Sequence, residues 1–450
     1  MSEGNAASME QTAVSPLDQL IYLAKLTPAD CPSDAVLLSR VSLADWLVCG
    51  IAGASEPVAE KMQAFAASEA GTASAASLFG GGEASARTAA LVNGTISHAL
   101  DYDDTHFDHV GHLSVGIYPA ALAMAEVQDA TADELCAAFL TGAEAAIRTG
   151  RVLGAAHYNR GFHQTATAGA FGATIAAGRL AGLNDMQMRA ALSLCATRAS
   201  GLKSQFGTMG KPLNAGIAAS NGVEAAQLAG LGLSSADDGL FGPQGFVETH
   251  ADSPEAFLAG FSELRFMENR YKFHACCHGL HAMIEGLRPL AASVDLADVE
   301  WLQIRTNPRW LRVCDLKTPR TGLEVKFSYA WLAGMVLSGL ETGDRALYTD
   351  ALAANRDLAA FAKKVEVVAD ASIGDQQGAG TLTLRDGMTR SYSHDLAAVV
   401  PPSELMERVA GKAKTVLGPR AAPVLELMHR LNDGPRAVSA RGIGALIRRA

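Results

Sequence analysis

Residues 33–53 read SDAVLLSRVSLADWLVCGIAG, and this stretch indicates the class of fold. Its apolar side chains recur every three or four residues, which predicts a helix with a broad apolar face. Ser33 is expected to cap the start of this helix, and Gly53 is expected to end it. The same helical spacing recurs on both sides of the stretch.

Helical spacing dominates the first half of the chain. Thr131, with Glu134 three residues later, forms a capping-box pattern at the start of one of these helices. No strand-like alternation occurs before about residue 265, so the sequence predicts an all-helical domain there. Besides 33–53, the predicted helices are 17–27, 56–69, 84–99, 115–128, 131–153, 164–182, 184–200 and 213–231.

The pattern changes after about residue 267, where alternating stretches predict strands. In the first of them, Val299, Trp301, Gln303 and Arg305 are expected to share one face. Asp386-Gly387 marks a hairpin turn in the last. The predicted strands are 299–307, 363–370 and 380–394, and the predicted helices are 277–292, 325–340, 344–362, 402–418, 420–432 and 436–449.

These elements predict a mainly α fold with an inserted part. Residues 1–267 and 402–450 are expected to form one large all-helical domain, built from both chain ends. A smaller α+β domain, residues 268–401, is expected to lie between them in the sequence.

The composition argues against several classes of protein. Hydrophobic residues make up 49% of the chain and charged residues 19%, as in a well-packed globular protein. A formal net charge of −10 argues against nucleic acid or an anionic membrane as a partner. The seven cysteines include no CxxC pair, which argues against a disulfide framework or a zinc ribbon. With a polar N-terminus and no long uninterrupted apolar run, we expect no membrane span and a soluble, cytoplasmic protein.

Residues 93–114, NGTISHALDYDDTHFDHVGHLS, gather most of the unusual titratable groups. Carboxylates and imidazoles that lie close together shift one another's pKa values, as acid–base chemistry at neutral pH requires. The alternative is a solvated acidic loop between two helices. The groups concerned are Asp101, Asp103, Asp104, Asp108, His98, His106, His109 and His112.

Three further polar clusters lie at the ends of predicted helices: GFHQT (161–165), KSQFGTMGKP (203–212) and RYKFHACCHGLH (270–281). Singly, each has a structural explanation: a hydrogen-bonded histidine, a surface turn at Lys211, or buried small side chains at Cys276-Cys277. Together they suggest a cationic cleft lined by imidazoles and suited to a small polycarboxylate. Lysines bind carboxylates. A histidine can remove a proton from, or return it to, the carbon atom next to a carboxylate.

Five motifs follow one another in the sequence: NGxxxHxLDYDDT, His-x-Ser, GFH, GTMxKPLNAGxAAxNGVxAAxLA and Lys-x-x-x-x-Cys-x-x-x-His. Their order resembles the MmgE/PrpD family, which includes 2-methylcitrate dehydratase, cis-aconitate decarboxylase and iminodisuccinate epimerase. The resemblance runs from about residue 17 to 435 and implies a helical domain, an inserted α+β lid with the active site between them, and a homodimer. It implies chemistry without a metal or other cofactor.

The resemblance also implies roles for individual residues. His112 corresponds to the family's acid–base histidine and His163 to the histidine of GFH. Asp101 and Thr105 correspond to a substrate-binding pair. The remaining expected site residues are Lys211, which precedes a proline, and Lys272, Cys277 and His281 of the lid motif.

The resemblance implies a cofactor-independent lyase, similar to 2-methylcitrate dehydratase, that acts on a small di- or tricarboxylic acid. Lys211 and Lys272 would hold carboxylates, while His112 and His163 would serve as acid and base and Asp101 would orient a histidine or the substrate. An epimerase of the iminodisuccinate type shares the first proton abstraction. Decarboxylase-like members carry a histidine where Cys277 stands, which argues against that activity.

Two departures and two other functions are also considered. The chain has His112-Leu113-Ser114 where the family has His-Pro-Ser, and 274–277 reads HACC where the family has Tyr-Pro-Ala-Cys. The altered lid motif would also suit an inactive binding homologue. A further alternative is a metal-dependent hydrolase, whose ligands would be His98, Asp101, Asp104, His109 and His112. No HExxH pattern is present.

Overall fold

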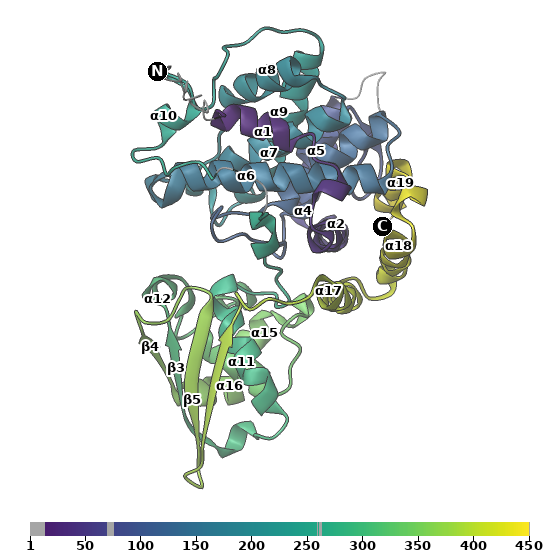
Figure 1. The fold of residues 1–450 in the computed structure, drawn as a ribbon. Helices are drawn as coiled ribbons and strands as arrows, with labels where there is room; N and C mark the ends of the chain where they lie inside the picture. The colour runs from purple at the N-terminus through teal and green to yellow at the C-terminus, as the bar shows by residue number, and fades with distance from the viewer. Residues whose placement is uncertain (1–13, 70–75, 259, 261–262, 450) are drawn as a thin grey trace, which may run out of the picture.

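The computed structural model describes residues 14–69, 76–258, 260 and 263–449, and it shows two lobes (Figure 1). The polar N-terminus up to residue 13 and residues 70–75 lie outside the described residues. The helical lobe contains the first ten helices and the last three. The sheet lobe contains the elements between them.

The helical lobe is built from long helices that pack side by side. Its helices are α1 (Pro16–Leu23), α2 (Ser33–Gly53), α3 (Pro57–Ser68), α4 (Ala86–Ser97), α5 (Ser114–Val127), α6 (Ala132–Arg160), α7 (Thr167–Leu180), α8 (Asp185–Ala196), α9 (Gly210–Gly230), α10 (Phe246–His250), α17 (Pro402–Leu417), α18 (Ala422–Asp433) and α19 (Ala440–Arg449).

The sheet lobe has one four-stranded sheet with helices against it (Figure 1). The strand order is β4-β3-β5-β6, with β3 parallel to β4 and antiparallel to β5. The elements are α11 (His281–Ala291), β3 (Val299–Thr306), α12 (Pro308–Cys314), α13 (Gly322–Val325), α14 (Tyr329–Leu337), α15 (Asp350–Ala353), α16 (Arg356–Ala362), β4 (Val365–Ala369), β5 (Gln377–Leu384) and β6 (Thr389–Asp395). The prediction of a mainly α fold with a small α+β part is confirmed.

The strand β3 departs from simple alternation. Val299 is fully buried, but Trp301, expected on the same face, is 42% exposed, while Leu302 and Ile304 are buried. The register of β3 against β5 shifts between Val299 and Trp301. A bulge inserts one residue here, so Val299 is buried like Leu302 and Ile304, and its expected place beside Trp301 was wrong. Trp301, Gln303 and Arg305 do share one face, as expected.

Several predicted elements differ locally. The segment expected to lack strands contains a two-residue pairing of β1 (Ala76–Ser77) with β2 (Glu83–Ala84). Pro32, and not Ser33, occupies the N-cap position of α2. The expected helices 325–340 and 344–362 are each interrupted. New helices begin where the side chains of Ser328, Thr349 and Asn355 accept backbone N–H groups.

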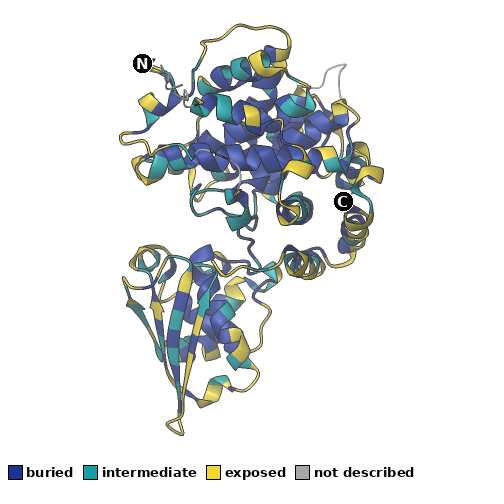
Figure 2. Cartoon of the chain, in the orientation of Figure 1, coloured by how far each residue is buried: buried dark blue, intermediate teal, exposed yellow. Residues whose placement is uncertain are grey.

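The apolar core of the helical lobe surrounds α2. By length and composition, α2 could cross a membrane, but 83% of its apolar window is buried inside the protein (Figure 2). Trp46 of α2 packs against Phe79 and Tyr118, and Tyr118 stacks on Phe139 with 3.8 Å between ring centroids. Its apolar surface is therefore explained by packing against neighbouring helices.

Helix α17, the first of the three helices near the C-terminus, is joined to α2 by a buried ion pair. The Nζ atom of Lys412 lies 2.6 Å from Oδ1 of Asp45 and 2.6 Å from the carbonyl oxygen of Tyr102. Both charged side chains are at most 1% exposed. A buried charge is costly unless it is paired, so this contact couples α17 to α2 and, through the Tyr102 carbonyl, to the loop that follows α4.

We predict that Lys412→Met destabilises the protein strongly, because it leaves the Asp45 carboxylate buried without its partner. Breaking one side of such a pair costs about 3–5 kcal/mol. Denaturant unfolding would measure the change, with the double variant Asp45→Asn, Lys412→Met as the comparison. The double variant should lose less than the single one. A loss below about 1 kcal/mol for Lys412→Met, the value of an exposed pair, would contradict the prediction.

Candidate active site

The loop between α4 and α5 carries the expected Asp/His group, and its backbone is held in an unusual conformation. Asp101 has a φ of 51°, in the left-handed region that side chains other than glycine seldom adopt. Its conformation is held by Lys272, whose Nζ lies 2.7 Å from the Asp101 carbonyl oxygen and 3.1 Å from Oδ1. Strained residues of this kind cluster at functional sites.

Two lysines meet on the Asp101 carboxylate. Lys211, in the first turn of α9, places Nζ 2.6 Å from Oδ2, and Lys272 approaches Oδ1 from the segment that leads to the sheet lobe. Burial opposes ionisation of Asp101, but the two ammonium groups outweigh it and hold the pKa of this carboxyl well below its ordinary value. Two ammonium groups therefore contact a single carboxylate, and the Asp101 side chain remains 46% exposed.

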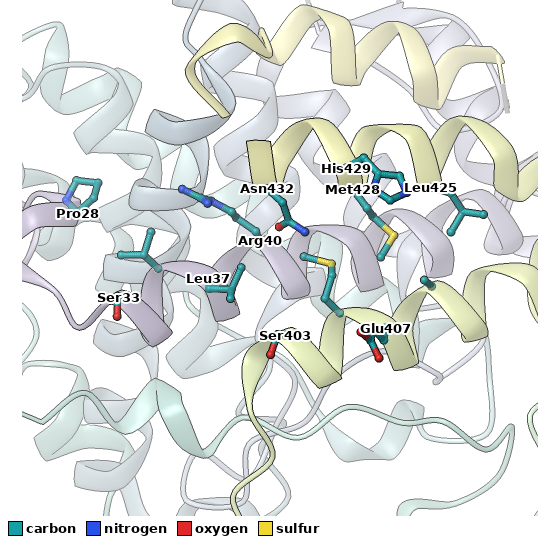
Figure 3. A pocket seen from close by; sticks show the side chains of 13 residues that line it. Pro28, Ser33, Leu37, Arg40, Ser403, Glu407, Leu425, Met428, His429 and Asn432 are labelled. Carbon is teal, nitrogen blue, oxygen red and sulfur yellow. The ribbon is translucent and has the colours of Figure 1, made fainter. Parts of the chain in front are cut away.

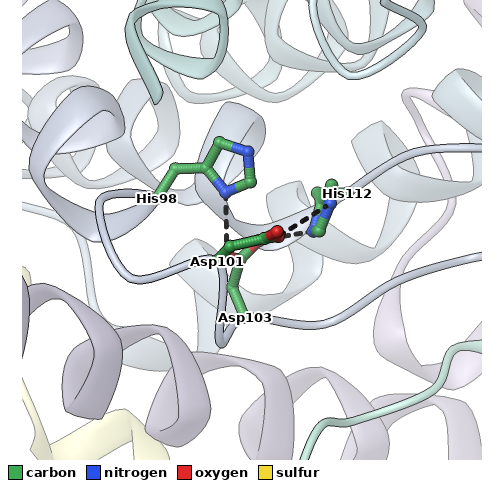
Figure 4. Close-up of side chains that lie close together, drawn as sticks. All are labelled: His98, Asp101, Asp103 and His112. Atoms are coloured by element: carbon green, nitrogen blue, oxygen red, sulfur yellow. Dashed lines mark hydrogen bonds and ion pairs between the residues drawn. The ribbon is translucent and has the colours of Figure 1, made fainter. Parts of the chain in front are cut away.

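A second carboxylate, Asp103, lies between two imidazoles (Figure 4). Its Oδ1 is 2.8 Å from Nδ1 of His98, and its Oδ2 is 2.8 Å from Nδ1 of His112. Asp103 and His98 are fully buried, and the His112 side chain is 10% exposed. Burial would raise the pKa of Asp103, but the two histidines hold it well below its ordinary value.

The expected partner of His112, His163, lies near the same group. Its Nδ1 is 3.1 Å from Nδ2 of Asn214, and its ring packs edge-on against Phe206. The His98 ring lies near both, with centroids 4.5 Å from His112 and 6.3 Å from His163. The structure therefore gathers His112, His163 and Asp101 from three separate sequence motifs.

The loop also joins the two lobes. Thr105 and Arg270 exchange backbone hydrogen bonds, N to O, at 2.8 Å in each direction. The Oγ1 atom of Thr105 lies 2.7 Å from Nδ1 of His278. The segment that begins the sheet lobe therefore pairs directly with the loop that carries the acidic group.

The other two expected site residues lie in the sheet lobe. Cys277 receives a hydrogen bond from the Cys314 thiol. This hydrogen bond, helped by the nearby charge of Lys272, holds the pKa of Cys277 below its ordinary value, although burial acts in the opposite direction. His281 is 2% exposed and lies behind His278, with 4.7 Å between their ring centroids. His278, rather than His281, therefore makes the contact with Thr105.

Family models match the chain in two consecutive regions. The MmgE/PrpD N-terminal domain matches residues 21–258, and the MmgE/PrpD C-terminal domain matches residues 274–419. The chain belongs to the MmgE/PrpD family. The expected membership is thereby confirmed.

Curated relatives of this MmgE/PrpD chain are named as decarboxylases. It is 29% identical over 289 residues to a cis-aconitate decarboxylase-like protein, oryM, of Aspergillus oryzae, a match that covers 60% of each chain. It is 29% identical over 288 residues to the cis-aconitate decarboxylase of Aspergillus terreus, covering 60% of this chain and 58% of the relative. The human cis-aconitate decarboxylase is 32% identical over 205 residues, 42% of each chain. The chain thus spans about 60% of the length of the first two relatives.

Sequence reasoning did not assign roles to three residues of this MmgE/PrpD site. Asp103 stood in the acidic stretch without a role, His278 lay in the HACCHGLH segment beside the expected His281, and Asn214 lay inside the motif after Lys211. The close spacing of His278 and His281 gave no basis for choosing between them. Only the three-dimensional contacts distinguish these residues.

The potential metal ligands that lie together in the structure differ from those predicted for a metal-dependent hydrolase. Among the described residues, His98, Asp101, Asp103 and His112 offer ligand atoms within 4.8 Å of one another, whereas the expected Asp104 and His109 are not in this group. Asp104 instead accepts hydrogen bonds from the backbone N and Oγ of Ser114 at the start of α5. Both ring Nδ1 atoms lie 2.8 Å from Asp103, and two ammonium groups flank Asp101. The added positive charge favours an acid–base cluster over a cation site.

A separate hollow lies away from these residues. A groove of about 770 Å³ runs between α2, α17 and α18 (Figure 3). It is mainly apolar, and its floor includes Leu37 and Met428. It contains none of the expected site residues.

We predict that the buried histidines of the loop make stability fall in acid. Burial lowers the pKa of His106 to about 4 and that of His109 to about 3, so the unfolded chain binds protons below pH 6.5 that the folded chain does not. Each histidine should therefore cost about 1.4 kcal/mol of stability per pH unit as the pH falls from about 6 to about 4.

The comparison of wild type with His109→Phe isolates one of these contributions from all other titrating groups. Denaturant unfolding at several pH values should show a slope shallower by about 1.4 kcal/mol per pH unit in the variant. Equal slopes in the two proteins would show that His109 is not held neutral.

Proposed function

We propose that this protein is a lyase that acts on a small di- or tricarboxylic acid, removing a proton from a carbon next to a carboxylate without a metal. The observation that carries the proposal is the meeting of His112, His163, Lys211 and Lys272 around Asp101. It supplies two groups that can move a proton and two that can hold carboxylates.

The charges around Asp101 support a polyanionic substrate. Two ammonium groups contact one carboxylate, and Lys211 is still 18% exposed. The Asp101 carboxylate shows the geometry in which these lysines hold such a group. A substrate carboxylate that reaches Lys211 and Lys272 would meet donors already in place, and an organic acid with a second carboxylate would gain most from them.

The reaction most consistent with this chemistry is elimination of water. One imidazole takes a proton from the carbon next to the carboxylate, and the electron pair left behind forms the carbon–carbon double bond. The β-hydroxyl group leaves with a proton from the second imidazole as water. Lys211 and Lys272 stabilise the charge that develops on the carboxylate as the first proton departs.

Two related outcomes begin from the same groups. Return of the proton on the opposite face would make the protein an epimerase. Decarboxylation is the activity in the names of the curated relatives, but Cys277 stands where decarboxylase-like members carry a histidine. We therefore place the dehydratase first, the epimerase second, and an inactive binding homologue last. From the family resemblance we also propose that the protein is cytoplasmic and forms a homodimer. Light scattering would test the homodimer.

Proton NMR of the purified protein in D₂O would separate these outcomes. The panel contains 2-methylcitrate, citrate, cis-aconitate and iminodisuccinate. A new alkene signal from a hydroxy acid is expected for a dehydratase, deuterium exchange without an alkene would indicate an epimerase, and loss of carbon dioxide a decarboxylase. Absence of turnover on the whole panel would contradict the proposal.

We predict that His112→Gln lowers kcat on the substrate so found by about 10²–10⁴-fold, the usual contribution of an acid–base group. The matched control is His429→Gln, because His429 lines the separate groove between α2, α17 and α18. Circular dichroism and thermal unfolding would confirm that both variants are folded. Unchanged kcat in His112→Gln would exclude this histidine from proton transfer.

A further inference from the structure

The two imidazoles of the proposed reaction have different hydrogen-bond partners at the same ring atom. Nδ1 of His112 faces two acceptors, the Asp103 carboxylate and the Asp104 carbonyl oxygen, whereas Nδ1 of His163 faces an amide donor, Asn214. A neutral imidazole has one N–H and one lone pair, and the partner of one nitrogen decides which is which.

We infer that Asp103 and Asn214 are positioning residues that hold His112 and His163 in opposite tautomers, so that His112 is the base and His163 the proton donor. The inference rests on the proposed function for its mechanistic meaning. The tautomers themselves follow from contacts that are independent of the substrate.

The contacts of His112 place its proton on Nδ1. This nitrogen lies 2.8 Å from Oδ2 of Asp103 and 2.8 Å from the carbonyl oxygen of Asp104, and neither atom can donate while Asp103 is ionised. The nearest acidic atom to Nε2 is Oδ1 of Asp101 at 3.5 Å, which is long for a hydrogen bond. The Nε2 lone pair is therefore available to accept a proton from a substrate.

The orientation of the Asn214 amide settles the other ring. Nδ2 of Asn214 lies 3.2 Å from the Leu202 carbonyl oxygen, which can only accept, so Nδ2 and not Oδ1 must stand on this side. The second hydrogen of the same NH₂ group then points to Nδ1 of His163, 3.1 Å away. Because Nδ1 accepts, the ring proton is on Nε2, and that N–H can donate to a leaving hydroxyl group.

The surrounding charges suit these two roles. When His112 accepts a proton, the imidazolium is paired with the Asp103 carboxylate at 2.8 Å, as in a carboxylate–histidine pair of a hydrolase. His163 has an uncharged partner, and burial together with His98, His112 and Lys211 keeps its pKa well below the ordinary value, despite Asp101. His163 therefore stays neutral and offers an N–H.

Nitrogen NMR of histidine-labelled protein tests the tautomers directly. The two ring nitrogens of a neutral histidine differ in chemical shift according to which one carries hydrogen, and long-range proton–nitrogen spectra correlate them with the ring protons. The chain has 12 histidines, and spectra of His112→Gln and His163→Gln assign the two signals. We expect hydrogen on Nδ1 of His112 and on Nε2 of His163 at neutral pH.

The opposite tautomer at either ring would overturn the inference, whatever the enzyme does with substrates. Conversely, the expected tautomers combined with no turnover of any carboxylic acid would contradict the proposed function and leave the positioning role in place. The two failures are therefore distinguishable.

Asn214→Asp provides the functional test. A carboxylate at this position accepts from Nδ1, so hydrogen should move from Nε2 to Nδ1 of His163, and kcat should fall by at least about 10²-fold. The matched control is Asn221→Asp, because Asn221 lies on the same helix and also donates to a backbone carbonyl, that of Arg198 at 2.8 Å. The control should keep both ring signals and kcat. Wild-type tautomer and kcat in Asn214→Asp would refute the assignment.

Discussion

The contact on which the site depends is the hold of two lysines on Asp101. Lys211 comes from the first turn of α9 and Lys272 from the segment that enters the sheet lobe, so a single carboxylate joins parts of the chain far apart in sequence. The same ammonium group of Lys272 binds the carbonyl oxygen of Asp101, whose backbone is left-handed. A left-handed residue costs about 1–2 kcal/mol, and these charge-assisted hydrogen bonds offset that cost. The left-handed backbone of Asp101 and the two lysines that bind its carboxylate therefore depend on each other.

Around this contact, each buried charge has a partner of the opposite sign or a set of donors. Asp45 has Lys412, and Asp103 has two imidazoles. Such compensation is what permits titratable groups inside a helical core that is otherwise apolar. It also explains why the catalytic proposal concerns the loop between α4 and α5 and not the apolar groove beside α17. Acid–base chemistry requires groups whose pKa values are shifted by their surroundings, and this loop supplies several of them, among them Asp101, Asp103 and His112.

Much of the fold could be predicted because helical spacing is a local property. The helices of the first half lie close to their expected positions, and the strands occur where alternation was found. The errors have identifiable causes. One extra residue in β3 placed Val299 on the face opposite to Trp301, and capping side chains such as Ser328 began new helices where the apolar pattern continued. Division of the chain at residues 267 and 401 stays a prediction, as do the roles of the site residues and the homodimer.

By itself, the sequence determined the family, the helical class and the residue types available for chemistry, because motif order and periodicity are properties of the linear chain. It placed Asp101, His112, His163, Lys211 and Lys272 among the candidates. Only the tertiary structure decided which of them meet, that His278 and not His281 contacts Thr105, and that Asp103 and Asn214 face the two imidazoles. Hydrogen-bond partners such as Asp45 and Lys412 lie 367 residues apart in the sequence, and no local pattern encodes which ring nitrogen a distant side chain will reach. The tautomer of a histidine is decided by that partner.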